Sequence, residues 1–148
     1  MPGTLSEEEA ASLLFMREEE KLAHDVYVTL YDQWGLRVFR NIAASEQKHT
    51  GAVARLLDAY GLEDPTIGNG VGEFTNPALQ ALYDDLVAQG SISAAEALKV
   101  GAAIEELDIA DLEQRIAETD NADIQLVYSN LLAGSANHLR AFSSTSRR

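Results

Sequence analysis

The stretch SEQKH, residues 45–49, places a carboxylate and an imidazole on one side of a predicted helix. Glu46 and His49 are three residues apart, so their side chains share a face, with Cβ atoms about 5–6 Å apart. The same face carries Ile42 and Val53, at the spacing of an apolar stripe that packs on other helices. A carboxylate and an imidazole on this stripe indicate a buried polar cluster, and both groups are ligands of transition metals.

The other three long helical patterns contain similar polar residues on their apolar stripes. Glu20 lies midway along the first pattern, and Glu105 interrupts the stripe of the third. Asp108 follows Glu105 by three residues and lies on the same side. In the fourth pattern the stripe includes Ser135 and His138. Each helix thus places at least one side chain able to bind a metal on the face that we expect to be buried.

Burial of these groups requires a compensating charge. An unpaired buried carboxylate costs several kcal/mol, and converging carboxylates repel one another and take up protons unless a cation balances them. The chain has no cysteine, which excludes thiolate zinc sites, iron–sulfur clusters, disulfides and cysteine nucleophiles. Oxygen and imidazole ligands without sulfur suit iron, manganese or zinc. The pattern therefore predicts a buried metal site, in which a pair of ions neutralises the carboxylates best.

Capping and stop signals define the elements that position these residues. A short helix is expected over about residues 77–89, and residues 143–148 are expected to form a frayed tail. The long helices are expected over about residues 6–34, 36–60, 93–119 and 122–142.

The connections predict the topology. Two tight connections make the first and second, and the third and fourth, long helices antiparallel neighbours. Residues 62–92 form a long crossover between these two hairpins, the arrangement of ferritin-like four-helix bundles. We expect residues 1–148 to form one all-α domain, since a chain of 148 residues is long enough to bury a real core.

Charge and hydropathy exclude several function classes. The net charge of −13 argues against nucleic acid and against an anionic membrane surface, because both would repel the chain. No apolar run approaches the roughly 20 residues that span a bilayer. The first 20 residues lack a basic segment followed by an apolar one, so we find no signal peptide and expect a cytoplasmic location.

Several motifs resemble the ferritin-like superfamily of carboxylate-bridged diiron proteins, with rubrerythrin-type proteins the nearest pattern. A narrower resemblance, over nearly the whole chain, is to short ferritin-like bacterial and archaeal proteins catalogued as a domain of unknown function. The motifs that carry it are REEEKLAHDVY, NIAASEQKH, GAAIEELDIADL and GSANHLRAF. By position, the resemblance implies a terminal ligand at Glu20, a bridging ligand at Glu46 and further ligands at His49, Glu105 and His138.

The fourth helix departs from the superfamily pattern. That pattern has a glutamate three residues before the histidine, where this chain has Ser135, and a hydroxyl is a poor ligand for a hard divalent cation. Either Asp108 or Glu106 supplies the missing carboxylate from the third helix, or the site holds a single metal or a looser pair. Since the helix turns Glu106 about 100° away from Glu105, we expect Glu106 on the surface.

The remaining candidates have structural explanations that we favour. Glu18 and Glu19 are expected to be solvated charges. His24 is expected to hydrogen-bond near the site or to face solvent. Tyr27 and Tyr128 are expected to be core aromatics rather than redox or hydrogen-bonding neighbours of a metal.

Two functions compete. The first is an oxidoreductase or ferroxidase-like protein with two metal ions, iron or alternatively manganese or zinc, that reacts with dioxygen or peroxide. It would need an external electron donor, because the chain has no rubredoxin-like cysteine segment. The second is a non-catalytic metal store, carrier or structural bundle, and a metal-free bundle with a polar network is a third. The resemblance leaves a homodimer open.

Overall fold

A computed structural model describes residues 4–146 of the chain, and every regular element in this range is a helix. The described residues contain no strand, so the all-α prediction is confirmed. None of these helices has the length and apolarity needed to cross a membrane. The five helices are α1 (Glu7–Trp34), α2 (Arg37–Ala59), α3 (Pro77–Gly90), α4 (Ala94–Ala117) and α5 (Ala122–Ser146).

Local signals explain where the helices begin and end. At the start of α1, the Ser6 hydroxyl accepts from the Glu9 backbone N–H, and the Ser6 N–H donates to the Glu9 carboxylate, each at 3.0 Å. This reciprocal pair satisfies two backbone donors that the helix itself leaves free. The helix ends at Gly35, whose φ of 68° lies in the left-handed region that glycine adopts without strain. At the starts of α3 and α4, the side chains of Asn76 and Ser93 accept hydrogen bonds from backbone N–H groups of the first turn, without the reciprocal bond seen at Ser6.

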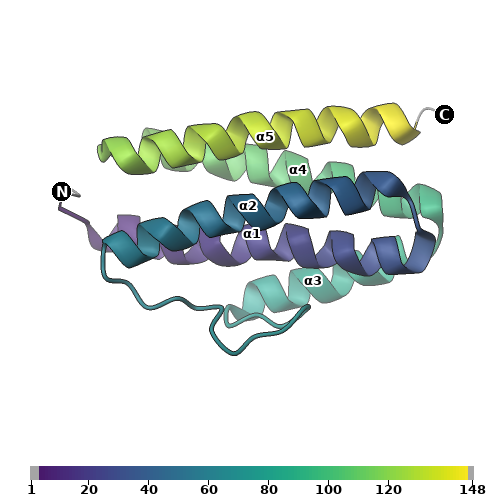
Figure 1. The fold of residues 1–148 in the computed structure, drawn as a ribbon, viewed down its shortest axis with the longest axis horizontal. Coiled ribbons are helices and arrows are strands. Elements are labelled where there is room, and N and C mark those ends of the chain that lie inside the picture. The colour runs from purple at the N-terminus through teal and green to yellow at the C-terminus, as the bar shows by residue number, and fades with distance from the viewer. Residues whose placement is uncertain (1–3, 147–148) are drawn as a thin grey trace.

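The long helices form two hairpins that pack against each other (Figure 1). One hairpin is α1 with α2 and the other is α4 with α5; α2 contacts α5, and α1 contacts α4. The short helix α3 lies outside these four helices and packs on α1 and α4. Helix α1 therefore has neighbours on three sides, which are α2, α3 and α4.

The crossover between the hairpins is tied to α1. The Arg17 guanidinium donates to the Asp64 carboxylate, with Nη2 and Oδ2 3.0 Å apart. Near the end of the crossover, just before α3, the backbone N–H groups of Thr75 and Asn76 donate to the Glu18 carboxylate at 2.7 Å and 3.1 Å. Glu18 is buried by these contacts, so the expectation that it is a solvated charge is wrong.

One helix boundary differs substantially from its prediction. Helix α5 was expected to end at about residue 142, followed by a frayed tail, but it continues to Ser146. Phe142 is fully buried and holds this end of α5 on the bundle, and the Thr145 hydroxyl donates back to the Ala141 carbonyl at 2.8 Å. The last two residues of the expected tail, 147 and 148, lie outside the described residues.

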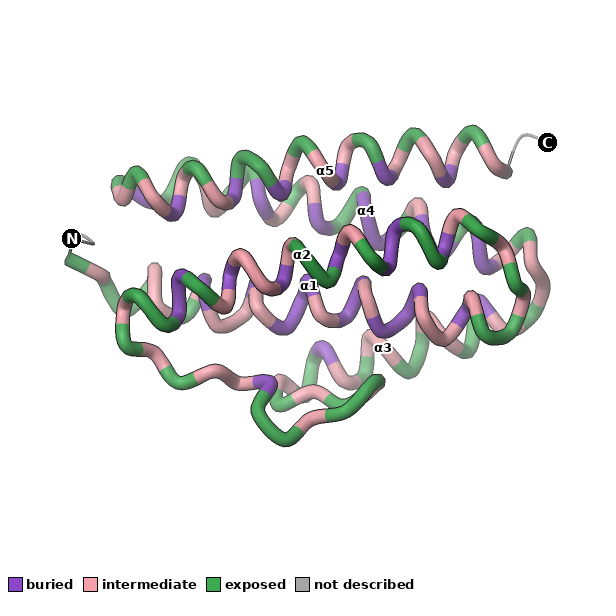
Figure 2. Tube along the Cα trace, viewed as in Figure 1, coloured by how far each residue is buried: buried purple, intermediate pink, exposed green. Residues whose placement is uncertain are grey.

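Two apolar clusters divide the interior of the bundle, and buried positions face inward along every long helix (Figure 2). One cluster contains Tyr27, Phe39 and Phe142, whose rings contact one another with centroids 5.2–6.0 Å apart. The second contains Leu13 and Leu112. Along each long helix, the polar residues of the predicted site lie between members of the first cluster and members of the second. The fold thus encloses a polar layer between two apolar ones.

Candidate metal centre

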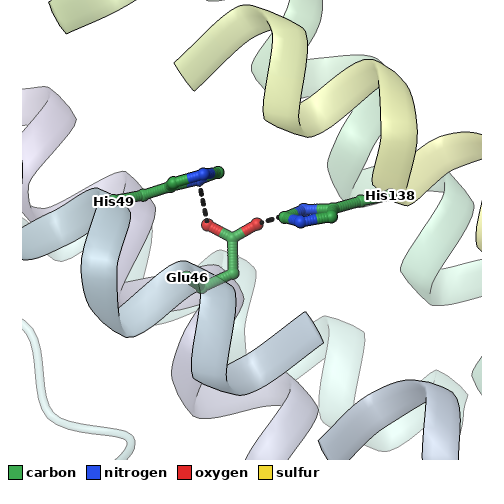
Figure 3. Close-up of side chains that lie close together, drawn as sticks. All are labelled: Glu46, His49 and His138. Atoms are coloured by element: carbon green, nitrogen blue, oxygen red, sulfur yellow. Dashed lines mark hydrogen bonds and ion pairs between the residues drawn. The ribbon is translucent and has the colours of Figure 1, made fainter. Parts of the chain in front are cut away.

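Glu46 lies between the two imidazoles of the polar layer (Figure 3). Its Oε1 is 2.9 Å from His138 Nδ1, and its Oε2 is 3.3 Å from His49 Nδ1. Atoms able to bind a metal on these three residues all lie within 4.8 Å of one another. Helix α2 supplies Glu46 and His49 through their three-residue spacing, and α5 brings His138 from the opposite hairpin.

Each imidazole also lies near a second carboxylate, in addition to that of Glu46. Glu20 Oε1 from α1 lies 3.4 Å from His49 Nδ1, and Glu105 Oε2 from α4 lies 3.5 Å from His138 Nδ1. All three glutamates have no solvent-exposed surface. Each imidazole Nδ1 therefore faces two carboxylates, and Glu46 is the one that both imidazoles share.

Asp108 brings a fourth carboxylate to the layer, beside Glu20. The Ser135 hydroxyl donates to Asp108 Oδ2 at 2.7 Å, and Asp108 Oδ1 is buried without a hydrogen-bond partner. The serine of α5 thus orients a carboxylate from α4, and Asp108 is one of the two residues expected to replace the missing glutamate. Glu106 is exposed, as predicted, so it does not supply this carboxylate.

Neighbouring residues orient the side chains that could bind a metal, through hydrogen bonds and packing. His138 Nε2 lies 3.0 Å from the Ser45 hydroxyl, which fixes the ring so that Nδ1 points into the layer. The Tyr27 hydroxyl donates to Glu105 Oε2 at 2.6 Å. The ring of His49 lies against Gly134, where any Cβ would approach the imidazole to 2.5 Å. Glycine at this position therefore makes room for the ligand.

Comparison with known proteins places the chain in a family. Residues 9–147 match the family described as "Uncharacterized protein domain (DUF2202)". The chain belongs to the DUF2202 family. This match confirms the resemblance to a family catalogued as a domain of unknown function.

A relative from Methanocaldococcus jannaschii, "Uncharacterized protein MJ0754", is 56% identical to this chain over 138 residues. The alignment covers 93% of this chain and 75% of that protein. The crystal structure of hypothetical protein MJ0754 superposes with a TM-score of 0.97 at 54% identity, over 98% of this chain and 83% of that chain. The helical arrangement described above is therefore also that of a solved relative.

The pKa values of this DUF2202 site reflect a surplus of buried negative charge. Burial and the neighbouring Glu46 raise the pKa of Glu105 to about 7, and they raise that of Glu20 well above its ordinary value. Burial and the charge of Glu20 likewise raise the pKa of Asp108. Protonation of these groups, or a cation among them, relieves the repulsion.

The shared glutamate and its histidine show the opposite shifts. Burial alone would raise the pKa of Glu46, but hydrogen bonds to His138 and contact with His49 outweigh burial and lower the pKa to about 2. Burial alone would lower the pKa of His138, but Glu105 and Glu46 raise it to about 9. The same balance, with Glu46 as the main partner, raises the pKa of His49. Positive charge between these carboxylates is therefore strongly favoured.

The spacing of the donor atoms suits a metal ion. Two ligand atoms bound about 2.1 Å from one ion at tetrahedral or octahedral angles are about 3.0–3.4 Å apart. The four measured separations between imidazole nitrogens and carboxylate oxygens are 2.9, 3.3, 3.4 and 3.5 Å. Among the described residues, oxygens of Glu20, Glu46, Glu105 and Asp108 are also buried without a hydrogen-bond partner. The residues present fit a metal centre without sulfur ligands.

All six residues predicted as ligands meet in this layer, and their role as ligands remains a prediction. The other histidine, His24, pairs with Asp25 at 2.8 Å and is partly exposed. Tyr27 and Tyr128 are buried in the two apolar clusters, as expected, but Tyr27 also hydrogen-bonds to Glu105, one of the predicted ligands.

Sequence reasoning missed Glu19, which was expected to be solvated but is buried. Glu19 belongs to a second stripe of α1, with Phe15, Leu22 and Val26 at spacings of four, three and four. This second stripe is the feature of the sequence from which the burial of Glu19 can be recognised.

Proposed function

We propose that this DUF2202 protein is a ferritin-like bundle that holds two divalent metal ions, iron or manganese, and reacts with dioxygen or peroxide. The observation that carries the proposal is the paired arrangement of the ligands. His49 with Glu20, and His138 with Glu105, each present an Nδ1 and a carboxylate to the shared Glu46. A carboxylate with each oxygen facing a different imidazole could supply one oxygen to each of two ions.

Charge balance supports two ions rather than one. The layer contains four buried carboxylates, those of Glu20, Glu46, Glu105 and Asp108. Two divalent ions with neutral imidazole ligands neutralise four carboxylates, whereas one ion leaves two negative charges buried. An uncompensated buried charge is strongly destabilising, so the pair is the better match.

The protein residues give this centre its environment. When bound, a pair of iron or manganese ions supplies the one-electron chemistry that dioxygen and peroxide require. The apolar clusters on both sides of the polar layer limit water at the site. Ser45, Ser135 and Tyr27 orient His138, Asp108 and Glu105 through hydrogen bonds to Nε2, Oδ2 and Oε2 of those residues. Electrons for repeated turnover come from an external donor, since the chain has no cysteine-based redox group of its own.

The proposal is tested by loading the protein anaerobically with ferrous iron and then admitting air. We expect about two irons per chain and a near-ultraviolet absorption band that develops on oxidation. Variants Glu46→Ala and His138→Ala should lose iron, whereas Glu106→Ala, an exposed residue adjacent to Glu105, should bind as much as the wild type. Equal iron content in all four proteins would refute the site assignment.

A non-catalytic metal carrier or structural bundle is the second candidate function. The observation that favours it is Ser135, which leaves α5 without the carboxylate of the superfamily pattern. In that case, the metal would raise the melting temperature, but air would produce no spectral change. Iron that binds at the expected stoichiometry and stays ferrous in air would therefore favour this function over the first.

A further inference from the structure

The outer side of α2 carries positive charge in a chain whose net charge is −13. Helices α1 and α4 contain eight and six acidic residues respectively, and two basic residues each. Helix α2 reverses this balance, because its acidic residues are only the buried Glu46 and the exposed Asp58. The basic residues of α2 are all exposed, and they are Arg37, Arg40, Lys48 and Arg55.

The cations of α2 have no carboxylate as a partner. On the other helices, Lys21 pairs with Asp25 at 2.6 Å and Lys99 pairs with Glu96 at 3.2 Å. In the part of the chain that the structure describes, no ion pair includes any of the four basic residues of α2. An acidic chain thus leaves one helix with unpaired positive charge on its surface.

Three of these cations lie in one row along the helix. Arg37, Lys48 and Arg55 are 11 and 7 residues apart, which is close to three and two whole helical turns, so they share a side of α2. The row is about 27 Å long at 1.5 Å per residue. A standard protein interface buries about 800 Å² per partner, which corresponds to a patch of roughly this width. The basic row is therefore long enough to bind a folded protein.

The same helix brings the centre nearest to the surface. Helices α2 and α5 lie side by side (Figure 1), and His49 directly follows Lys48. The side chains of His49 and His138 are 14% and 9% exposed, whereas the three glutamates of the centre have no exposed surface. The two imidazole rings are stacked with their centroids 5.4 Å apart. The imidazoles are therefore the ligands at which the centre meets the surface.

We propose that the outer side of α2 binds an acidic electron-carrier protein, which reduces the centre at the exposed edges of His49 and His138. This inference rests on the proposed function, which requires an external electron donor. The electrons balance, because two carriers, each oxidised by one electron, return two trivalent ions to the divalent state. The acidic helices α1 and α4 repel such a carrier, and screening confines each interaction to about 8 Å at physiological salt. The basic row is therefore the surface at which an acidic protein can bind.

The spacing of the row favours a protein over a nucleic acid. Double-stranded DNA has one negative charge per about 1.7 Å of its axis. The cations of the row lie about 17 Å and about 11 Å apart along α2. The exposed residues Ala44 and Gln47, between Arg37 and Lys48, are uncharged. A row this sparse neutralises few phosphates, but it matches the scattered carboxylates of an acidic protein surface.

The proposal is tested by calorimetric titration of the full chain, metal-free and iron-loaded, with an acidic plant-type ferredoxin. The wild type should bind at about 20 mM salt and at least about tenfold more weakly at about 0.5 M salt, where the Debye length is only about 4 Å. Lys48→Glu and Arg55→Glu should each weaken binding about tenfold at the lower salt concentration, because each places like charges opposite one another. Both variants should hold as much iron as the wild type, since neither residue is a predicted ligand.

Lys99→Glu is the matched control, because Lys99 is exposed on α4. Each of the three charge reversals takes the net charge from −13 to −15, so they repel an acidic carrier equally at long range. The affinity of Lys99→Glu should remain within about threefold of the wild type. The rate at which reduced ferredoxin reduces the oxidised, iron-loaded protein should fall in Lys48→Glu and Arg55→Glu, but not in Lys99→Glu.

Several outcomes overturn the proposal. A wild type that does not bind the ferredoxin, or equal binding by all three variants, would show that the basic row is not a docking surface. Tighter binding of duplex DNA or phosphatidylserine vesicles, lost in Arg55→Glu, would assign the row to a nucleic acid or a membrane. Self-association at low salt, lost in the same variant, would assign it to a second copy of the chain. A chain that binds ferredoxin but no iron refutes the proposed function, whereas one that binds two irons but no ferredoxin refutes only the docking surface.

Discussion

Gly134 provides a sharp test of the centre, because its missing side chain determines where His49 lies. A Cβ added at Gly134 would be 2.5 Å from Cε1 and 2.6 Å from Nε2 of His49, whereas ordinary contacts begin at 3.4 Å. In Gly134→Ala the imidazole must therefore move by roughly 1 Å, several times the tolerance of about 0.2 Å for metal–ligand distances. We expect metal affinity to fall by about 10–100-fold, as when a ligand loses its orientation.

Gly51→Ala is the matched control. Both substitutions replace a helical glycine, and each should gain about 1 kcal/mol from helix propensity. At Gly51 the new Cβ meets nothing closer than Arg55 Nη1 at 4.0 Å, so that gain should appear as a higher melting temperature. At Gly134 a clash of about 1–3 kcal/mol offsets the gain. Metal titration with a competing chelator, and thermal unfolding with and without metal, measure both effects. The reasoning is wrong if Gly134→Ala binds metal as tightly as Gly51→Ala does.

Three further predictions concern the ligand Glu105 and the residues Tyr27 and Ser135, which hydrogen-bond to ligands. Burial raises the pKa of Glu105 to about 7 from an unfolded value near 4.5, so the folded chain holds this proton more tightly. The metal-stripped protein should therefore lose about 3 kcal/mol of stability as the pH rises from about 4.5 to about 7, and Glu105→Gln should lack this loss in urea unfolding. Tyr27→Phe leaves a Glu105 oxygen without its donor and should cost about 1–3 kcal/mol in thermal unfolding; a change near zero would contradict this. Ser135→Ala should weaken metal binding about tenfold or more, while the double variant Ser135→Glu with Asp108→Ala, which moves the carboxylate from α4 to α5, should still bind two ions in a metal analysis.

Much of the fold was predictable because its signals are local. The cap at Ser6 and the stop at Gly35 depend on a few neighbouring residues, and the structure places α1 between them. The end of α5 depends instead on the burial of Phe142 against other helices. A contact of that kind joins distant segments, so periodicity within one helix does not reveal it.

The candidate site was predictable for a related reason. A polar residue on an apolar stripe, such as Glu46 or Glu105, is visible in a single helix. Glu19 was missed because α1 contacts α2, α3 and α4, so more than one of its faces is buried, and a search for one stripe assigns the others to solvent. The bond from Ser135 to Asp108 joins two helices, and sequence alone could only offer Asp108 as one of several replacements.

The turn of α1 over residues 17–20 has a consequence for how such chains can vary in length. Arg17 and Glu18 hold the crossover, Glu19 faces α4, and Glu20 enters the centre. Consecutive positions of an α-helix are about 100° apart, so inserting or deleting one residue here would rotate every later side chain of α1 by that angle. The bonds that hold the crossover to α1 and the Glu20 carboxylate of the centre would then be lost together. We therefore expect natural insertions and deletions among related chains to fall in the crossover loop, and this turn to keep its length even where its residues change.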